Sequence, residues 1–138
     1  ISCGAIRTPA HTDINMRLSM IYDDMKEIIE KYHPDEMAIE ELFFNTNSKT
    51  AIVVAEARGI ILLSARLKEI EIAEYTPLQV KQAVVGYGRA EKKQVITMVT
   101  SFLNLPAPPK PDDTADALAI AVCHAHSGAS RLAKYYNK

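Results

Sequence analysis

The sequence predicts an α/β fold in which helices flank a sheet. Short apolar runs typical of strands alternate along the chain with longer segments whose apolar residues recur every three or four positions. The length of 138 residues suits one domain with its own hydrophobic core and is short for two. We therefore expect residues 1–138 to form a single α/β domain.

Each expected element follows from a local pattern. The strands are expected at residues 1–8, 36–42 and 69–75, and the helices at 14–32, 49–67, 77–85, 90–105 and 113–126. Thr12 and Asp13 offer caps for the first helix, whose apolar stripe includes Met25 and Ile28. Gly128 follows the last helix, and residues 128–138 are expected to be a flexible basic tail.

The charge is unevenly distributed along the chain. Residues 1–79 carry 8 basic and 13 acidic side chains, whereas residues 80–138 carry 8 basic and 4 acidic ones. A basic half indicates a surface for a polyanion, although solvated lysines explain the same composition. Two widely separated cysteines, Cys3 and Cys123, and the lack of a membrane-length apolar run favour a cytoplasmic protein without membrane contact.

Two acidic groups lie far apart in the sequence. Asp113 and Asp116 share one face of the first turn of a helix, where Asp112 is expected to act as the cap. Glu40 and Glu41 end a short apolar strand, and periodicity does not decide which of them faces a site. Neighbouring carboxylates repel unless a cation lies between them, so these groups predict a divalent metal site.

Aromatic and basic residues lie close to these acidic groups. Phe43 follows the carboxylates and is either a core residue or, if exposed, a side chain that stacks on an unpaired base. The densest basic group consists of Lys81, Arg89, Lys92 and Lys93, and it flanks a glycine-containing turn that a phosphate backbone could approach closely. These residues are candidates for DNA binding.

Several short blocks, taken together, resemble the bacterial Holliday-junction resolvase family RuvC. The blocks are Ala38-Ile39-Glu40, Glu56-Ala57-Arg58-Gly59, Gln79-Val80-Lys81-Gln82, Val84-Val85-Gly86, Ala90-Glu91-Lys92 and the segment from Asp113 through Asp116 and the apolar residues after it. They occur in the order of the family and extend over nearly the whole chain.

The resemblance implies a ribonuclease-H-like mixed sheet flanked by helices, in a homodimer that nicks four-way DNA junctions symmetrically during recombination and repair. It implies Mg²⁺, two ions per active site, with Mn²⁺ able to substitute, and a branch-migration helicase as a partner. By position, Glu40, Asp113 and Asp116 correspond to the catalytic metal ligands. Lys81 and Lys92 correspond to catalytic basic residues near the scissile phosphate, and Phe43 to an aromatic residue at the crossover.

The sequence departs from the family in one respect. The family has a further metal-binding aspartate in an Asp-Pro-Gly motif on an earlier strand, and no aspartate of this sequence lies in such a motif. We therefore expect the sheet to lack its first strand or two and these 138 residues alone to have little or no nuclease activity. The alternative is a module on the same fold that binds junction DNA or a partner without cleavage.

Overall fold

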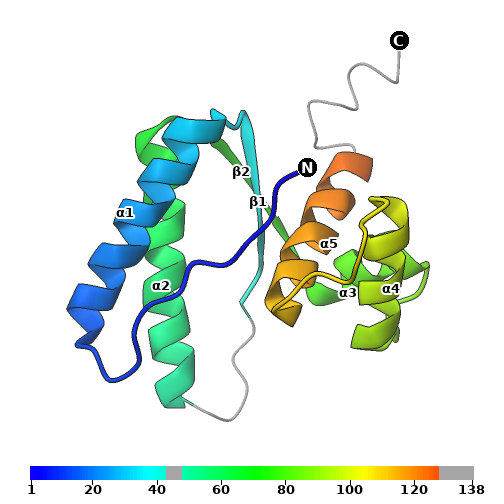
Figure 1. Cartoon of the computed structure of the whole chain (residues 1–138), viewed down its shortest axis with the longest axis horizontal. Helices are drawn as coiled ribbons and strands as arrows, with labels where there is room; N and C mark the ends of the chain where they lie inside the picture. The colour runs from blue at the N-terminus through cyan, green and yellow to red at the C-terminus, as the bar shows by residue number, and fades with distance from the viewer. Residues whose placement is uncertain (43–47, 128–138) are drawn as a thin grey trace. The chain divides into compact units, whose positions relative to one another are not determined.

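A computed structural model describes residues 1–42 and 48–127 (Figure 1). Helices and strands alternate in the first half, and three helices follow, as expected for an α/β chain. The elements are α1 (Ile14–Tyr32), β1 (Glu36–Glu40), α2 (Ser48–Leu67), β2 (Glu71–Tyr75), α3 (Pro77–Val85), α4 (Lys92–Phe102) and α5 (Asp112–His126). Within the described part of the chain, no helix is both long enough and apolar enough to cross a membrane.

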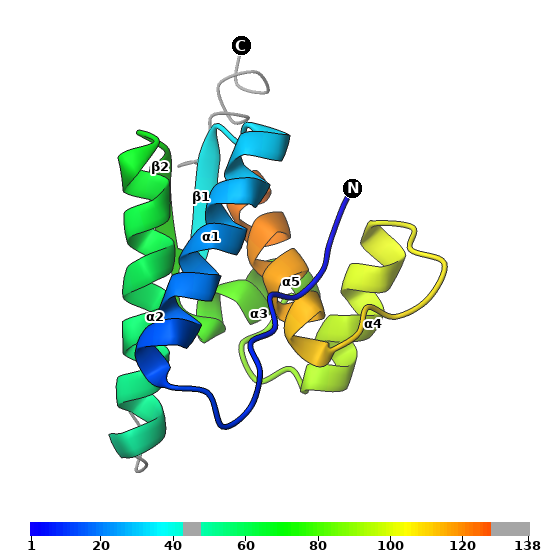
Figure 2. The same cartoon turned by 60° about the vertical axis from the view of Figure 1, so that its left-hand side comes forward.

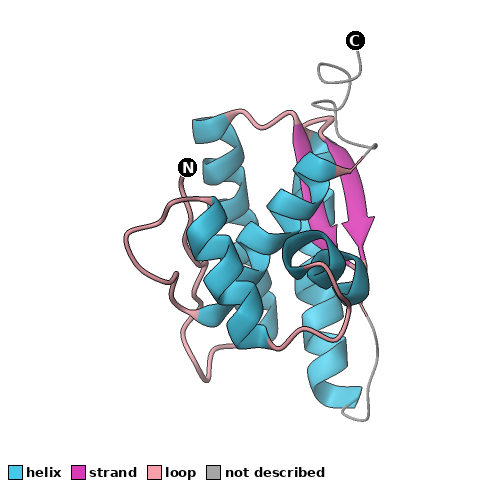
Figure 3. Cartoon of the chain, turned by 90° about the vertical axis from the view of Figure 1, so that its right-hand side faces the viewer, coloured by secondary structure: helices cyan, strands magenta, loops and turns pink. Residues whose placement is uncertain are grey.

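The sheet described by the structure consists of β1 paired with β2. The two strands point in the same direction (Figure 3), and the segment that contains α2 supplies the crossover that parallel neighbours need. Just beyond β1, the backbone N–H of Glu41 donates to the carbonyl oxygen of Tyr75 at 2.8 Å, which sets the register of the strand ends.

The expected strand at residues 1–8 is wrong, since this segment has no regular secondary structure. Its alternating pattern permits an extended backbone, but a strand also requires a partner that accepts and donates its backbone hydrogen bonds. Among the described residues, the sheet includes no strand other than β1 and β2.

The described residues form two compact units, of which one contains residues 6–37, 42 and 48–72. In this unit α1 and α2 lie side by side (Figure 2). Asp13 caps α1, because its carboxylate accepts from the N–H of Asn15 at 3.0 Å. The core contains Ile29, Ala65 and Ile70, so the apolar stripe expected through Ile28 is wrong at that position, where the side chain is exposed.

The other unit contains residues 1–5, 38–41 and 73–127 of the described chain. Helices α3, α4 and α5 pack against one another around a core that includes Val84, Val99 and Ala119. Helix α3 begins with a capping box, in which Thr76 accepts from the N–H of Gln79 and donates its own N–H to the Gln79 side chain. It ends at Gly86, whose φ of 97° suits glycine.

Helices α4 and α5 differ slightly from their expected bounds. Helix α4 is shorter at both ends, because Glu91 forms a capping interaction with Gln94 and Asn104 adopts a positive φ beyond the helix. Helix α5 begins one residue early, with Pro111 in the cap position. The expected cap role of Asp112 is therefore wrong, and this residue lies in the first helical turn.

Candidate active site

A cavity of about 260 Å³ lies in the unit that contains α3, α4 and α5. Four charged residues line it: Glu40, Lys81, Lys92 and Asp116. The rest of the lining is apolar and consists of Pro77, Val80, Val95, Ala119 and Ile120. Charged side chains on a partly apolar wall experience a weaker dielectric than in bulk water, so their mutual interactions are strengthened.

Three of the four charged residues lie at or near an end of their element, and Lys81 lies in the middle of the short helix α3. Glu40 is the last residue of β1, and Lys92 is the first residue of α4. Lys81 lies one turn into α3, which Pro77 opens, and Asp116 lies one turn into α5. One strand end, two helix N-terminal turns and the middle of α3 thus bring four residues from distant parts of the sequence to one place.

Lys92 and Asp116 form an ion pair across the cavity. The Lys92 Nζ lies 3.1 Å from Oδ2 of Asp116, and the two side chains are 51% and 40% exposed. This hydrogen bond and the charge of Asp116 raise the pKa of Lys92, and the charges of Asp112 and Asp113 add to the shift. Lys92 therefore stays protonated and presents a positive charge beside the carboxylates.

For Glu40 the surroundings disfavour the charged form, whereas for Lys92 they favour it. Partial burial raises the pKa of Glu40 above its ordinary value, and repulsion by the Asp116 carboxylate raises it further. The positive charge of Lys92 counteracts part of this effect. Ionised Glu40 is thus disfavoured by its surroundings, and a cation that approaches both carboxylates would relieve the repulsion.

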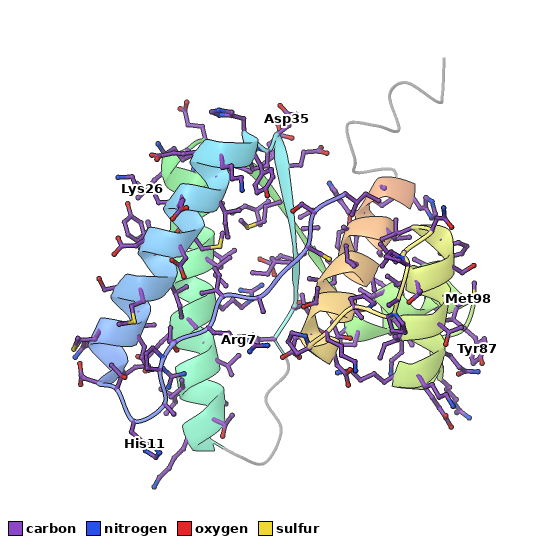
Figure 4. The ribbon with its side chains drawn as sticks, in the orientation of Figure 1. Arg7, His11, Lys26, Asp35, Tyr87 and Met98 are labelled. Atoms are coloured by element: carbon purple, nitrogen blue, oxygen red, sulfur yellow. The ribbon has the colours of Figure 1, made fainter. Side chains whose placement is uncertain are left out.

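The remaining predicted residues lie outside this cavity. Asp113 is exposed in the first turn of α5 and acts on Lys92 through its charge. Lys93 lines a second cavity of about 270 Å³, together with Met98, which Figure 4 labels near Tyr87. Arg89 is exposed. Phe43 lies outside the described residues, so its expected role at a crossover stays a prediction.

The apolar wall of the cavity is not among the residues predicted from the sequence. Most of its residues follow from helical spacing, because Pro77 lies four residues before Lys81 and Val80 lies three residues after Pro77. Ala119 and Ile120 likewise follow Asp116 by three and four residues. Helical periodicity around each charged residue could therefore have identified most of this wall.

Comparison with known proteins identifies the family. The sequence model described as "Crossover junction endodeoxyribonuclease RuvC" matches residues 1–124. A curated protein of that name from Alkaliphilus metalliredigens (strain QYMF) is 62% identical over 128 residues, which are 93% of this chain and 78% of the relative. The protein of that name from Clostridioides difficile (strain 630) is 58% identical over 127 residues, which are 92% of this chain and 75% of the relative.

Solved structures agree with the sequence matches. The structure of Thermus thermophilus RuvC in complex with Holliday junction substrate has a TM-score of 0.82 and 36% identity, covering 87% of this chain and 73% of that one. A further structure of Thermus thermophilus RuvC gives a TM-score of 0.79 at the same identity. These matches confirm the α/β, ribonuclease-H-like fold class. The chain therefore belongs to the RuvC family of crossover junction endodeoxyribonucleases.

Proposed function

We propose that the protein carrying these residues is a Mg²⁺-dependent endonuclease that resolves four-way DNA junctions in recombination and repair. The observation that carries the proposal is that Glu40 and Asp116 line the same cavity as Lys81 and Lys92. The similarity to a solved RuvC in complex with Holliday junction substrate supports a branched DNA as the ligand. Family membership supports cleavage rather than binding alone.

The residues at the cavity fit Mg²⁺. This ion is held by one or two carboxylates together with water and substrate phosphate oxygens, and Glu40 and Asp116 supply two such carboxylates. Within residues 1–42 and 48–127 no cluster of three or more candidate metal ligands occurs. When bound, Mg²⁺ polarises the phosphate and activates water. Asp113, the second residue of α5 and three residues before Asp116, is the further candidate ligand, and phosphate and water oxygens are proposed to fill the remaining positions.

Lys81 and Lys92 are proposed to act on the phosphate. Both line the cavity, and Lys92 stays protonated beside Asp116. A fixed positive charge stabilises the negative charge that develops on phosphate oxygens during displacement. Arg89 and Lys93 lie outside the cavity and are assigned to phosphates along the DNA backbone, where they contribute affinity and salt dependence.

A homodimer is proposed from the surface of α2. Ile52, Leu63 and Leu67 are 58%, 48% and 59% exposed, and their spacing places them along one helical face. Gly59 lies on the same face, with open space where a Cβ would project. A second α2 could approach closely there and cover the apolar side chains.

We also infer that these residues belong to one functional domain and that the protein acts in the cytoplasm. A branch-migration helicase is proposed as its partner.

The experiment that tests the function is cleavage of an end-labelled synthetic four-way junction by the full-length protein that carries these residues, with a linear duplex of the same sequence as the control substrate. We expect Mg²⁺-dependent, symmetric nicks in the junction alone. Because a catalytic metal supplies several kcal/mol, Glu40→Gln and Asp116→Asn should each lower the cleavage rate by about a hundredfold or more while junction binding persists. Glu41→Gln, which changes the neighbouring residue, is the matched control.

Junction binding without nicking in Mg²⁺ or Mn²⁺ would overturn the proposal. That outcome would instead assign these residues to a module that binds branched DNA without cleavage. Equal loss of activity in Glu41→Gln and Glu40→Gln would contradict the assignment of the carboxylate and leave the general function in place.

A further inference from the structure

Tyr75 connects the two elements that carry the cavity carboxylates. It is the last residue of β2, and its backbone carbonyl accepts the hydrogen bond from Glu41, the residue after Glu40. Its side chain is only 7% exposed and packs in the core beneath α5. One residue therefore contacts the end of β1 through its backbone and α5 through its side chain.

The Tyr75 hydroxyl is anchored at the C-terminal end of α5. It lies 2.7 Å from Nδ1 of His124 and 2.7 Å from Oγ of Ser127. The two aromatic rings also contact each other, with centroids 5.7 Å apart. The Ser127 hydroxyl in turn donates to the backbone carbonyl of His124 at 2.9 Å.

These three contacts determine where the protons lie. A serine hydroxyl has one proton, and Ser127 gives it to the His124 carbonyl, so the Tyr75 hydroxyl must donate to Ser127. Tyr75 then has no proton left for His124, and the His124 Nδ1 must carry the hydrogen that donates to the phenolic oxygen. All three hydrogen bonds are satisfied only when His124 is protonated at Nδ1.

We propose that Tyr75 is a positioning residue for the cavity carboxylates, an inference that rests on the proposed function. Asp116 and His124 belong to the same helix and lie eight residues apart, which corresponds to about 12 Å along its axis. The apolar core holds α5 against its neighbours, but apolar contacts allow small shifts along and around the helix axis. The directional hydrogen bonds of Tyr75 limit those shifts and so hold Asp116 at its distance from Glu40.

The test compares Tyr75→Phe with Tyr87→Phe in the same protein. Both variants remove one hydrogen-bonded tyrosine hydroxyl, since the Tyr87 oxygen accepts from Gln94 Nε2 at 2.6 Å. For Tyr75→Phe we expect about a tenfold lower single-turnover cleavage rate with unchanged junction affinity. A displaced Asp116 carboxylate slows the chemical step strongly, whereas it has little effect on the affinity for DNA. We also expect a several-fold rise in the dissociation constant for Mn²⁺ alone, measured by electron paramagnetic resonance.

A spectroscopic measurement tests the same network without catalysis. Long-range ¹H–¹⁵N spectra of the wild type should show the neutral His124 ring protonated at Nδ1, and Tyr75→Phe should lose this preference. A Tyr75→Phe protein that melts at a lower temperature but cleaves and binds Mn²⁺ like the wild type would overturn the proposal. If the wild type does not nick the junction, the proposed function fails, and the Mn²⁺ comparison still decides the role of Tyr75. A wild type that does not bind Mn²⁺ overturns this inference too.

Discussion

Lys92 holds a position in which one substitution should change metal affinity and cleavage in opposite directions. Its ammonium group neutralises part of the negative charge of Asp116 at 3.1 Å and lowers the pKa of Glu40. The same charge is proposed to face the phosphate. Lys92→Met therefore removes a competitor of the metal ion and, at the same time, a group that stabilises the reaction.

The size of the first effect follows from the exposure of the ion pair. Side chains that are 51% and 40% exposed form a solvent-screened pair, which is worth about 0.2–1 kcal/mol. If binding of the metal ion at Asp116 requires loss of this pair, its removal should lower the dissociation constant for Mn²⁺ by about 1.4- to 5-fold. The second effect is larger, since removal of one donor to a developing negative charge lowers rates by about 10²–10³.

Two measurements on Lys92→Met check these expectations. Electron paramagnetic resonance of free Mn²⁺ gives the metal affinity, and single-turnover cleavage of a four-way junction gives the rate. Lys93→Met makes the same change in net charge one residue away and controls for the metal affinity, which it should leave unchanged. Weaker Mn²⁺ binding by Lys92→Met, or a cleavage rate within about tenfold of the wild type, would refute the reasoning.

Two further predictions concern stability. Glu40→Gln should be more stable than the wild type at neutral pH. The raised pKa of Glu40 means that the folded protein favours the protonated carboxyl, so this residue costs no stability at low pH and destabilises the fold once the pH rises through that pKa. Glutamine stays neutral and avoids this loss. The gain should disappear on acidification below the usual titration range of a glutamate, as followed by urea unfolding at several pH values, and an equal gain in Glu41→Gln would contradict it. Val99→Ala should cost about 2–3 kcal/mol, since the side chain is 0% exposed and loses two methyl groups and their packing. Urea unfolding with an unchanged m value checks this, and exposed Ser101→Ala should stay within about 0.5 kcal/mol of the wild type.

Local chemistry made much of the secondary structure predictable. Asp13 and Thr76 accept hydrogen bonds from the first amides of α1 and α3, and Gly86 ends α3 at the positive φ that it tolerates best. These interactions join residues within four positions of each other, so the sequence contains both partners. The same holds for the short blocks that identify the family, which depend on residue identity and spacing alone.

Contacts between residues far apart in the sequence decided whether an extended segment became a strand and which of two adjacent isoleucines entered the core. Residues 1–8 alternate like a strand but have no strand structure, because pairing depends on another part of the backbone. Ile29 rather than Ile28 enters the core, since the direction in which α1 meets α2 selects between adjacent positions.

For the candidate site, the sequence by itself determined which residue types are present, and the tertiary structure decided which of them meet. Glu40 lines the cavity and Asp113 does not, although both carboxylates match the family pattern. Lys92 and Asp116 are 24 residues apart and become ion-pair partners only when α4 packs against α5. The physical reason is that burial and charge–charge distance, which set the pKa values of Glu40 and Lys92, are properties of packed elements and not of a local sequence.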